Sequence, residues 1–236
     1  MFRALRRDID AALRHDPAAR SHWEVLLAYP GLHALALHRV SHALWNRGRF
    51  LGARLFSHHA RFLTGVEIHP GARIADGVFI DHGMGVVIGE TAVIEEGCIL
   101  YKGVVLGGTS PERRVRHPHL KRNVIVGSNA CVLGAITLGE AARIGSASVV
   151  IRDVPAGATV VGVPGRVVRE RHGPHTESLN HGSLPDPVTD VMHQLSRQQE
   201  AVMERLARLE RRWGVAEGPE ADSREADLRK RLGSIF

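Results

Sequence analysis

Aliphatic residues recur every six positions through the middle of the chain. A helix repeats every 3.6 residues and a strand every two, so neither explains a period of six. A coil of three short strands does, because each strand turns one aliphatic side chain inward and small residues such as Gly71 and Gly127 allow the turns. Over residues 64–169 the pattern therefore predicts a left-handed parallel β-helix of hexapeptide repeats. Its inward positions, with a two-residue shift after Val86, are Ile68, Ile74, Ile80, Val86, Ile88, Ile94, Leu100, Leu106, Val126, Val132, Leu138, Ile144 and Val150.

The repeat is interrupted at 107–125 by "GGTSPERRVRHPHLKRNVI", a stretch that carries five Lys and Arg residues and one Glu. Segments expelled from a regular solenoid often hold functional residues. The alternative is a solvated basic loop. We expect this loop to contribute to a site.

The flanking regions have helical spacing. Residues 1–63 place apolar side chains three and four apart, which predicts an N-terminal helical domain, and makes the fold α+β. After a Pro/Gly-rich linker at 170–190, residues 191–213 form a heptad seam with one polar position, Gln199. This pattern predicts either a coiled-coil helix or an amphipathic helix packed on the body. A charged tail follows at 214–236.

Charge and composition narrow the function. The net charge is +6, but residues of both signs are mixed along the chain, whereas nucleic-acid binders gather cations on one face. A site for an anionic small molecule, such as a CoA phosphate, fits this charge. Cys98 and Cys131 lie inside apolar repeats and are expected to be buried free thiols of a reducing compartment. The N-terminus has no apolar signal region, and no run is long enough to span a membrane. We expect a soluble cytoplasmic protein that binds neither nucleic acid nor membrane.

The candidate chemistry lies in polar residues that break the repeat. In "FIDHGMGVVIGE" the pair Asp81–His82 sits among apolar residues and glycines. Glu67 is about one coil away, so its carboxylate is placed to orient the imidazole of His82 and leave one ring nitrogen as a base. The alternative is a turn that is merely polar. The other candidates are His69, Glu90, Arg116, His117 and His119.

Several segments together resemble the serine acetyltransferases. They are "RHDPAAR", "YPGLHALALHRVSHALW", "VEIHPGARI", "FIDHGMGVVIGETAVI", "VVLGGT", "RHPHL" and "VGVPGRVV", and they span roughly residues 8–170. Hexapeptide repeats alone are shared by many acyltransferases, but "DHGMGVVIGETAVI" followed by "RHP" after "LGGT" is more specific. The resemblance implies transfer of acetyl from acetyl-CoA to the hydroxyl of L-serine, the first step of cysteine biosynthesis.

The resemblance also assigns roles. His82 would be the general base and Glu67 would orient it, at a position where the family often has Asp. Asp81 and Asp16 would hold the ammonium of the substrate, although Asp16 before Pro17 also suits a helix cap. Arg116 and His117 would hold the carboxylate, the arginine through a charge-assisted pair, with a plain basic loop as the alternative. Backbone along the CoA arm would come from Gly107, Gly108, Ser128 and Ser146.

The thioester is already activated, so direct attack in a ternary complex needs no metal and no covalent enzyme intermediate. The alternatives are another acceptor such as homoserine, a zinc-dependent γ-type carbonic anhydrase on the same solenoid, or a non-enzymatic scaffold. The family further implies feedback inhibition by L-cysteine and a homotrimer or dimer of trimers. It also implies association with O-acetylserine sulfhydrylase through a C-terminal Ile, which is penultimate here as Ile235 before Phe236.

Overall fold

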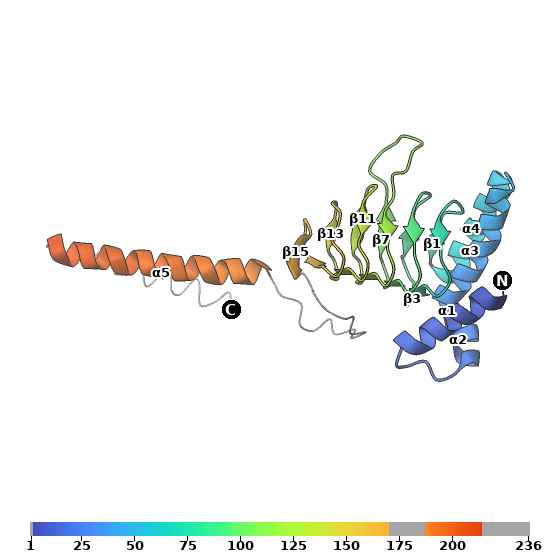
Figure 1. Ribbon diagram of the computed structural model, residues 1–236, viewed down its shortest axis with the longest axis horizontal. Helices are drawn as coiled ribbons and strands as arrows, with labels where there is room; N and C mark the ends of the chain where they lie inside the picture. Colours follow the sequence, from blue (N-terminus) through green and yellow to red (C-terminus); the bar gives the residue numbers. More distant parts are fainter. Residues whose placement is uncertain (1, 170–186, 214–236) are drawn as a thin grey trace. The chain divides into compact units, whose positions relative to one another are not determined.

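The computed structural model describes residues 2–169 and 187–213. Four helices come first: α1 (Phe2–His15), α2 (His22–Ala28), α3 (Pro30–Asn46) and α4 (Phe50–Thr64). Fifteen short strands follow, and then the long helix α5 (Pro187–Trp213) (Figure 1). The chain divides into two compact units, Met1–Pro185 and Asp186–Phe236. The strands are β1 (Glu67–Ile68), β2 (Arg73–Ile74), β3 (Phe79–Ile80), β4 (Val87–Ile88), β5 (Val93–Ile94), β6 (Ile99–Leu100), β7 (Val105–Gly107), β8 (His119–Leu120), β9 (Ile125–Val126), β10 (Cys131–Leu133), β11 (Thr137–Leu138), β12 (Arg143–Ile144), β13 (Val149–Val150), β14 (Thr159–Val161) and β15 (Arg166–Arg169).

The strands form three sheets. From β1 to β13 each strand pairs with the third one along the chain, and β14 and β15 extend the third sheet beyond β12. The orders are β1-β4-β7-β10-β13, β2-β5-β8-β11 and β3-β6-β9-β12-β14-β15. All pairs are parallel except β14 with β15. The chain therefore coils through the three sheets in turn and makes a solenoid with one strand of each sheet per coil.

The aliphatic side chains spaced six residues apart fill the interior of this solenoid. Of the thirteen inward positions expected from the sequence, twelve are buried, and Ile74 is partly buried and packs against the same cluster. The register stacks them in columns, for example Ile68 on Ile88 and Ile88 on Leu106. The interruption is shorter than the expected 107–125, because β8 and β9 already rejoin the sheets. The projecting loop is residues 108–118 (Figure 1).

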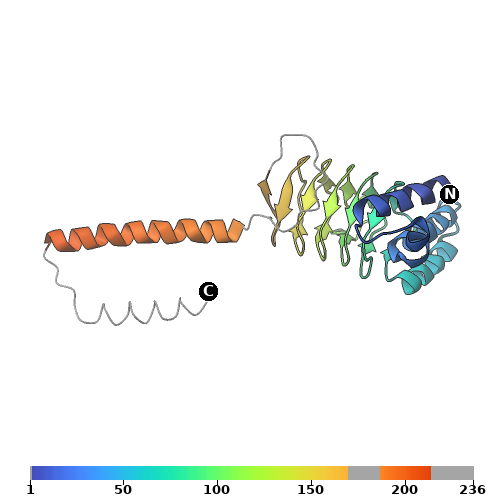
Figure 2. The same ribbon diagram turned by 90° about the horizontal axis from the view of Figure 1, so that it is seen from below.

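The N-terminal helices lie at the end of the solenoid where it starts, as Figures 1 and 2 both show. They cover outward positions of the β3 sheet, where Phe79, Ile99 and Ile125 cluster with Ile9 of α1 and Leu32 of α3. These strands are apolar on both faces because one face packs in the interior of the solenoid and the other packs against the helices.

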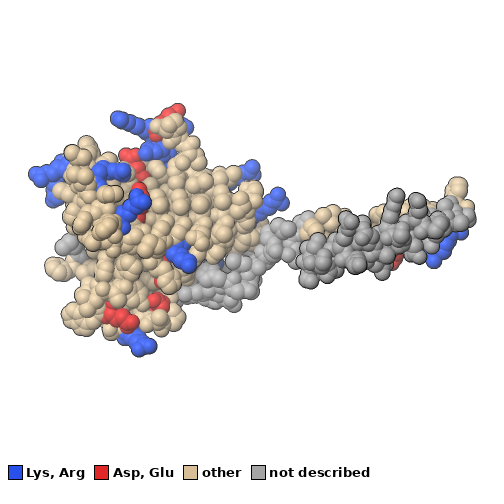
Figure 3. All heavy atoms as spheres, turned by 180° about the vertical axis from the view of Figure 1, so that it is seen from behind, with Lys and Arg blue, Asp and Glu red and all other residues tan. Residues whose placement is uncertain are grey.

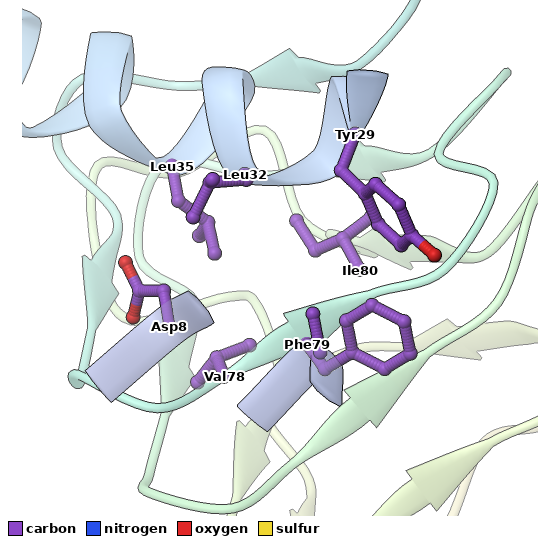
Figure 4. Close-up of a pocket in the computed structure, with 8 residues that line it drawn as sticks. Asp8, Tyr29, Leu32, Leu35, Val78, Phe79 and Ile80 are labelled. Carbon is purple, nitrogen blue, oxygen red and sulfur yellow. The ribbon is translucent and has the colours of Figure 1, made fainter. Parts of the chain in front are cut away.

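Two close contacts fix this packing. Gly31 of α3 approaches β3 so tightly that a Cβ there would overlap the backbone carbonyl of Ile80. The buried carboxylate of Asp8 in α1 accepts a hydrogen bond from the backbone N–H of Gly77 at 2.8 Å and pairs with Arg39 at 2.6 Å. Figure 4 shows Asp8 and the α3 leucines facing Val78–Ile80 across a small pocket. Helix α1 is thus tied to the first coil by a hydrogen bond and to α3 by an ion pair, as well as by apolar contacts.

Helix α5 carries the heptad seam on its exposed surface. Met192, Leu195, Val202 and Leu206 are all more than a third exposed, so the coiled coil stays a prediction. The linker and the charged tail, with Ile235 and Phe236, lie outside the described residues. Among the helices that are described, none combines the length and the apolar character needed to cross a membrane.

Candidate active site

The Asp81–His82 pair lies on an enlarged turn between β3 and β4. This turn has six residues, 81–86, whereas the turn stacked on it, between β6 and β7, has four, 101–104. His82 has a φ of 59°, in the left-handed region that residues other than glycine rarely adopt. Asn129 and Ala147 share that conformation, so the twist itself belongs to the solenoid. The two extra residues are specific to the coil that carries His82.

The imidazole of His82 faces outward, with 72% of its side chain exposed. Its Nε2 atom lies 3.7 Å from Oδ2 of Asp81, which is too long for a hydrogen bond. Asp81 is mostly buried, and its pKa is raised by burial, lowered by the charge of His82 and raised by the nearby Asp16. Two carboxylates therefore share this place with little cationic compensation from the chain itself.

Asp16 reaches the same place from the end of α1. One carboxylate oxygen accepts a hydrogen bond from the backbone N–H of Ala18 at 2.8 Å, as a turn residue does. The other accepts a hydrogen bond from the hydroxyl of Tyr29 at 2.6 Å. Burial and Asp16 raise the pKa of Tyr29, so this hydroxyl stays protonated as a donor. Tyr29 is a site residue that sequence reasoning missed, because only the packing of α1 beside α3 brings it to Asp16.

Arg116 and His117 lie at the end of the projecting loop, on a different edge of the solenoid. This edge joins the sheet that contains β4 (the β4 sheet) to the sheet that contains β5. The guanidinium of Arg116 donates a 2.6 Å hydrogen bond to the carboxylate of Glu90. This bond holds the pKa of Glu90 below its ordinary value. Glu90, one of the candidates from the sequence, is thus the group that fixes the arginine.

His117 is buried to 8% exposure and packs over two glycines. A Cβ on Gly89 would overlap its ring, and one on Gly108 would lie 3.1 Å from its Nε2 atom. Its Nδ1 atom lies 2.9 Å from Oγ1 of Thr91 and 3.2 Å from the Thr91 backbone nitrogen. Burial and Arg116 lower the pKa of His117. The ring is therefore neutral near pH 7 and held in one orientation.

Glu67 and His82 are in adjacent coils, but each has another ion partner in this chain. The carboxylate of Glu67 lies 3.0 Å from a guanidinium nitrogen of Arg61, at the end of α4. His82 is next to Asp81 instead. The expected dyad of Glu67 and His82 remains a prediction, in which the carboxylate has to exchange Arg61 for the imidazole.

The residues expected along the CoA arm divide between the same two edges of the solenoid. Ser128 and Ser146 lie in successive turns above Asp81–His82, with the carbonyl of Ser128 accepting a 2.8 Å hydrogen bond from Ala147. Gly107 ends β7, and Gly108 packs against Arg116. The residues expected along the CoA arm therefore lie on the same two edges of the solenoid as His82 and Arg116.

The site groups thus form two clusters of opposite character on the two edges of the β4 sheet. The first, which we call the acidic cluster, consists of Asp16, Asp81, Tyr29 and His82. The second, the basic cluster, consists of Arg116 and His117 with their supports Glu90 and Thr91.

On the face seen in Figure 3, Lys and Arg are interspersed with Asp and Glu over the loop and helices. Among the described residues, no three or more His, Cys, Asp or Glu side chains are arranged to hold a metal ion.

Comparison with known proteins places this arrangement in a family. No family model matches the chain. A serine acetyltransferase of Bacillus licheniformis is 50% identical over 210 residues, which is 89% of this chain and 97% of that protein. One of Synechococcus elongatus is 52% identical over 206 residues, covering 87% of this chain and 84% of its own length. The chain therefore belongs to the serine acetyltransferases, as the motifs indicated.

Solved structures agree. The serine acetyltransferase of Vibrio cholerae matches with a TM-score of 0.71 and 42% identity over 73% of this chain and 67% of that one. A Brucella abortus serine acetyltransferase in complex with coenzyme A matches with a TM-score of 0.70 and 38% identity over 72% and 68%. A serine acetyltransferase in complex with cysteine matches with a TM-score of 0.70 and 40% identity over 71% and 69%.

Proposed function

We propose that the chain transfers the acetyl group of acetyl-CoA to the hydroxyl of L-serine, giving O-acetyl-L-serine and CoA in cysteine biosynthesis. Family membership supports the reaction. The observation that carries it in this chain is the pair of clusters, one with Asp16 and Asp81, the other with Arg116 and His117. An amino acid is a zwitterion and needs an anionic partner at one end, a cationic partner at the other, and a base at its hydroxyl.

The acidic cluster suits an ammonium group. Burial and Asp16 raise the pKa of Asp81, so the free site bears carboxylates that lack a full counter-charge. A bound ammonium would supply that charge, and both carboxylates would then be ionised favourably. The hydroxyl of Tyr29 donates to one oxygen of Asp16. The other lone pairs of the Asp16 carboxylate can then accept hydrogen bonds from the ammonium of the substrate.

The chemistry assigned to His82 is general-base catalysis. Its exposed imidazole takes the proton of the serine hydroxyl as the hydroxyl oxygen attacks the carbonyl carbon of the thioester. The tetrahedral intermediate then expels the CoA sulfur, the C–S bond breaks, and the imidazolium returns the proton to the leaving thiolate. Glu67 is assigned to orient His82, and the backbone around Gly107, Gly108, Ser128 and Ser146 to line the CoA arm.

The two clusters cannot serve one serine within one chain. The ammonium and the carboxylate of serine are bonded to the same carbon atom. Glu90 is four residues beyond Val86, where the turn of His82 ends, which is roughly 13 Å along an extended chain. The acidic cluster of one copy therefore meets the basic cluster of a neighbour, in a groove between the flat faces of left-handed β-helices. We propose a homotrimer on this ground, with a dimer of trimers through the N-terminal helices as the larger assembly.

Mixed oligomers test this shared site. We expect the variants His82→Ala and Arg116→Ala each to lose activity when made alone. Random trimers of the two contain some sites that take His82 from one chain and Arg116 from the next, so the mixture regains up to about a quarter of wild-type activity. Activity no greater than the sum of the separate variants would show that each site uses a single chain.

Two further partners follow from the same site. L-cysteine carries the ammonium and carboxylate of serine, and a related enzyme has been solved with cysteine bound. We propose that cysteine competes with serine at this site and acts as feedback inhibitor.

Association with O-acetylserine sulfhydrylase through the Ile235–Phe236 terminus remains a proposal that a pull-down with and without these two residues would test.

The reaction is tested by release of the CoA thiol. The full chain is supplied with acetyl-CoA and L-serine, then with homoserine, then without acceptor, in parallel with His82→Ala. We expect release with serine from the wild type only. Equal release with homoserine would show that the enzyme accepts another hydroxyl substrate. No release with serine would favour a non-enzymatic scaffold. Unchanged release by His82→Ala would refute the base assignment alone.

A further inference from the structure

The hydroxyl of Thr91 is the centre of the basic cluster. Thr91 lies on the turn between β4 and β5, and Oγ1 accepts a hydrogen bond from the backbone N–H of Arg116 at 3.0 Å. It accepts a second from the backbone N–H of His117 at 3.1 Å. The same oxygen is 2.9 Å from Nδ1 of His117. One side chain thus holds both the backbone and the ring at the end of the projecting loop, 25 and 26 residues further along the chain.

These contacts determine where the protons are. A hydroxyl has two lone pairs and one hydrogen, and both lone pairs of Thr91 are used by the two backbone N–H groups. Its hydrogen therefore goes to the remaining neighbour, Nδ1 of His117. The backbone N–H of Thr91 donates to the same nitrogen at 3.2 Å. Nδ1 of His117 is thus an acceptor twice over and carries no proton of its own.

The ring must then be protonated on its other nitrogen. A neutral imidazole has one N–H, and burial together with Arg116 keeps this ring neutral near pH 7. With Nδ1 occupied, the proton sits on Nε2. This edge of the ring lies over Gly89 and Gly108, where side chains larger than hydrogen would collide with it or crowd it. Glycine at both positions thus makes room for the ring itself.

We propose that Thr91 is a positioning residue that fixes His117 as its Nε2–H tautomer, so that His117 donates a hydrogen bond to the carboxylate of the bound amino acid. This deepens the proposed function and rests on it for the identity of the ligand. The pairing is consistent with the neighbouring Arg116, which presents further donors to the same anion. With the other tautomer, Nε2 would present a lone pair to the carboxylate and repel it.

The test compares Thr91→Val with Thr91→Ser in the full chain. Valine keeps the shape and removes the hydroxyl, whereas serine keeps the hydroxyl and removes a methyl group. We expect Thr91→Val to lower kcat/KM for serine by roughly tenfold or more, with KM for serine raised and KM for acetyl-CoA little changed. Thr91→Ser should recover most of this loss. Thr137 lies on β11, pairs with His119 and belongs to neither cluster, so Thr137→Val is the matched control for replacing a threonine.

The tautomer is read independently of activity. In protein labelled with 15N-histidine, the His117 resonances are assigned from their absence in His117→Asn. We expect an unprotonated Nδ1 and a protonated Nε2 in the wild type and Thr91→Ser, and a mixture in Thr91→Val. A protonated Nδ1 in the wild type, or equal kinetics for the valine and serine variants, would overturn the proposal. If the wild type releases no CoA with serine, the proposed function fails while the NMR measurement still decides the tautomer.

Discussion

Gly89 controls whether the basic cluster can form, and Gly89→Ala is the most specific perturbation that the structure suggests. Gly89 directly precedes Glu90 and Thr91, and the ring of His117 lies over it. A Cβ at this position would overlap the Cδ2 and Nε2 atoms of that ring, and even the more distant Cγ would be only 2.8 Å away. Ordinary carbon contacts are about 3.5 Å, so the Nε2 edge must shift by about 1 Å or more.

The size of the effect follows from that shift. A displacement of about 1 Å in a group that positions substrate costs on the order of 100-fold in rate. We therefore expect Gly89→Ala to lower kcat/KM for serine roughly 100-fold, measured by CoA release over a range of serine concentrations. The fold should survive, because the obstacle is one side chain rather than backbone and the φ of Gly89 is not positive. Thermal unfolding of the variant is the accompanying measurement.

Gly52→Ala is the matched control. Gly52 lies in α4 with nothing within 4 Å of its hypothetical Cβ, and alanine there stabilises a helix by about 0.5–1 kcal/mol. Its kinetics should match the wild type. Full activity in a folded Gly89→Ala protein would show that the position of His117 does not matter for serine.

Three further predictions concern the acidic cluster and the helices. Tyr29→Phe removes the donor to Asp16 and should raise KM for serine by about fivefold or more, with KM for acetyl-CoA unchanged in the same assay. Asp8→Ala leaves Arg39 with only its 3.5 Å contact to Asp76 and should lower the free energy of unfolding by about 3 kcal/mol in urea titration; no loss would mean that the ion pair does not hold α1. Burial, with His42, lowers the pKa of His38 to about 3, so the unfolded chain binds more protons below pH 6.5. Stability should then fall by about 2 kcal/mol between pH 7 and 5 from this group, and His38→Gln should lessen that fall, which urea titrations at both pH values would detect.

The solenoid could be predicted because its signal is repeated. Each coil presents the same six-residue constraint, so a single sequence contains many independent copies of it, and the interior positions from Ile68 to Val150 are accordingly buried or nearly so. The interrupted coil was harder to delimit. The polar residues around β8 resemble the loop, and only pairing of Leu120 with Ile94 shows that the repeat has already resumed.

Residues of the candidate site could be predicted only where they belong to a recognisable sequence motif. Asp81 and His82 are conspicuous within an apolar stretch, and the shift after Val86 corresponds to their enlarged turn. Thr91 and Tyr29 gave no such signal. Their roles arise from contacts with residues 26 and 13 positions away, which depend on how the loop folds back and how α1 meets α3. The partner of Glu67 was unpredictable for the same reason, since Arg61 approaches it only through the end of α4.

The most direct test of the account is identification of the product. Purified protein is incubated with acetyl-CoA and L-serine, and the mixture is analysed by mass spectrometry while free thiol is followed in parallel. We expect serine heavier by one acetyl group, in a one-to-one ratio with released CoA, and neither product from His82→Ala. Release of CoA without acetylated serine, or acetylated serine from His82→Ala at the wild-type rate, would contradict it.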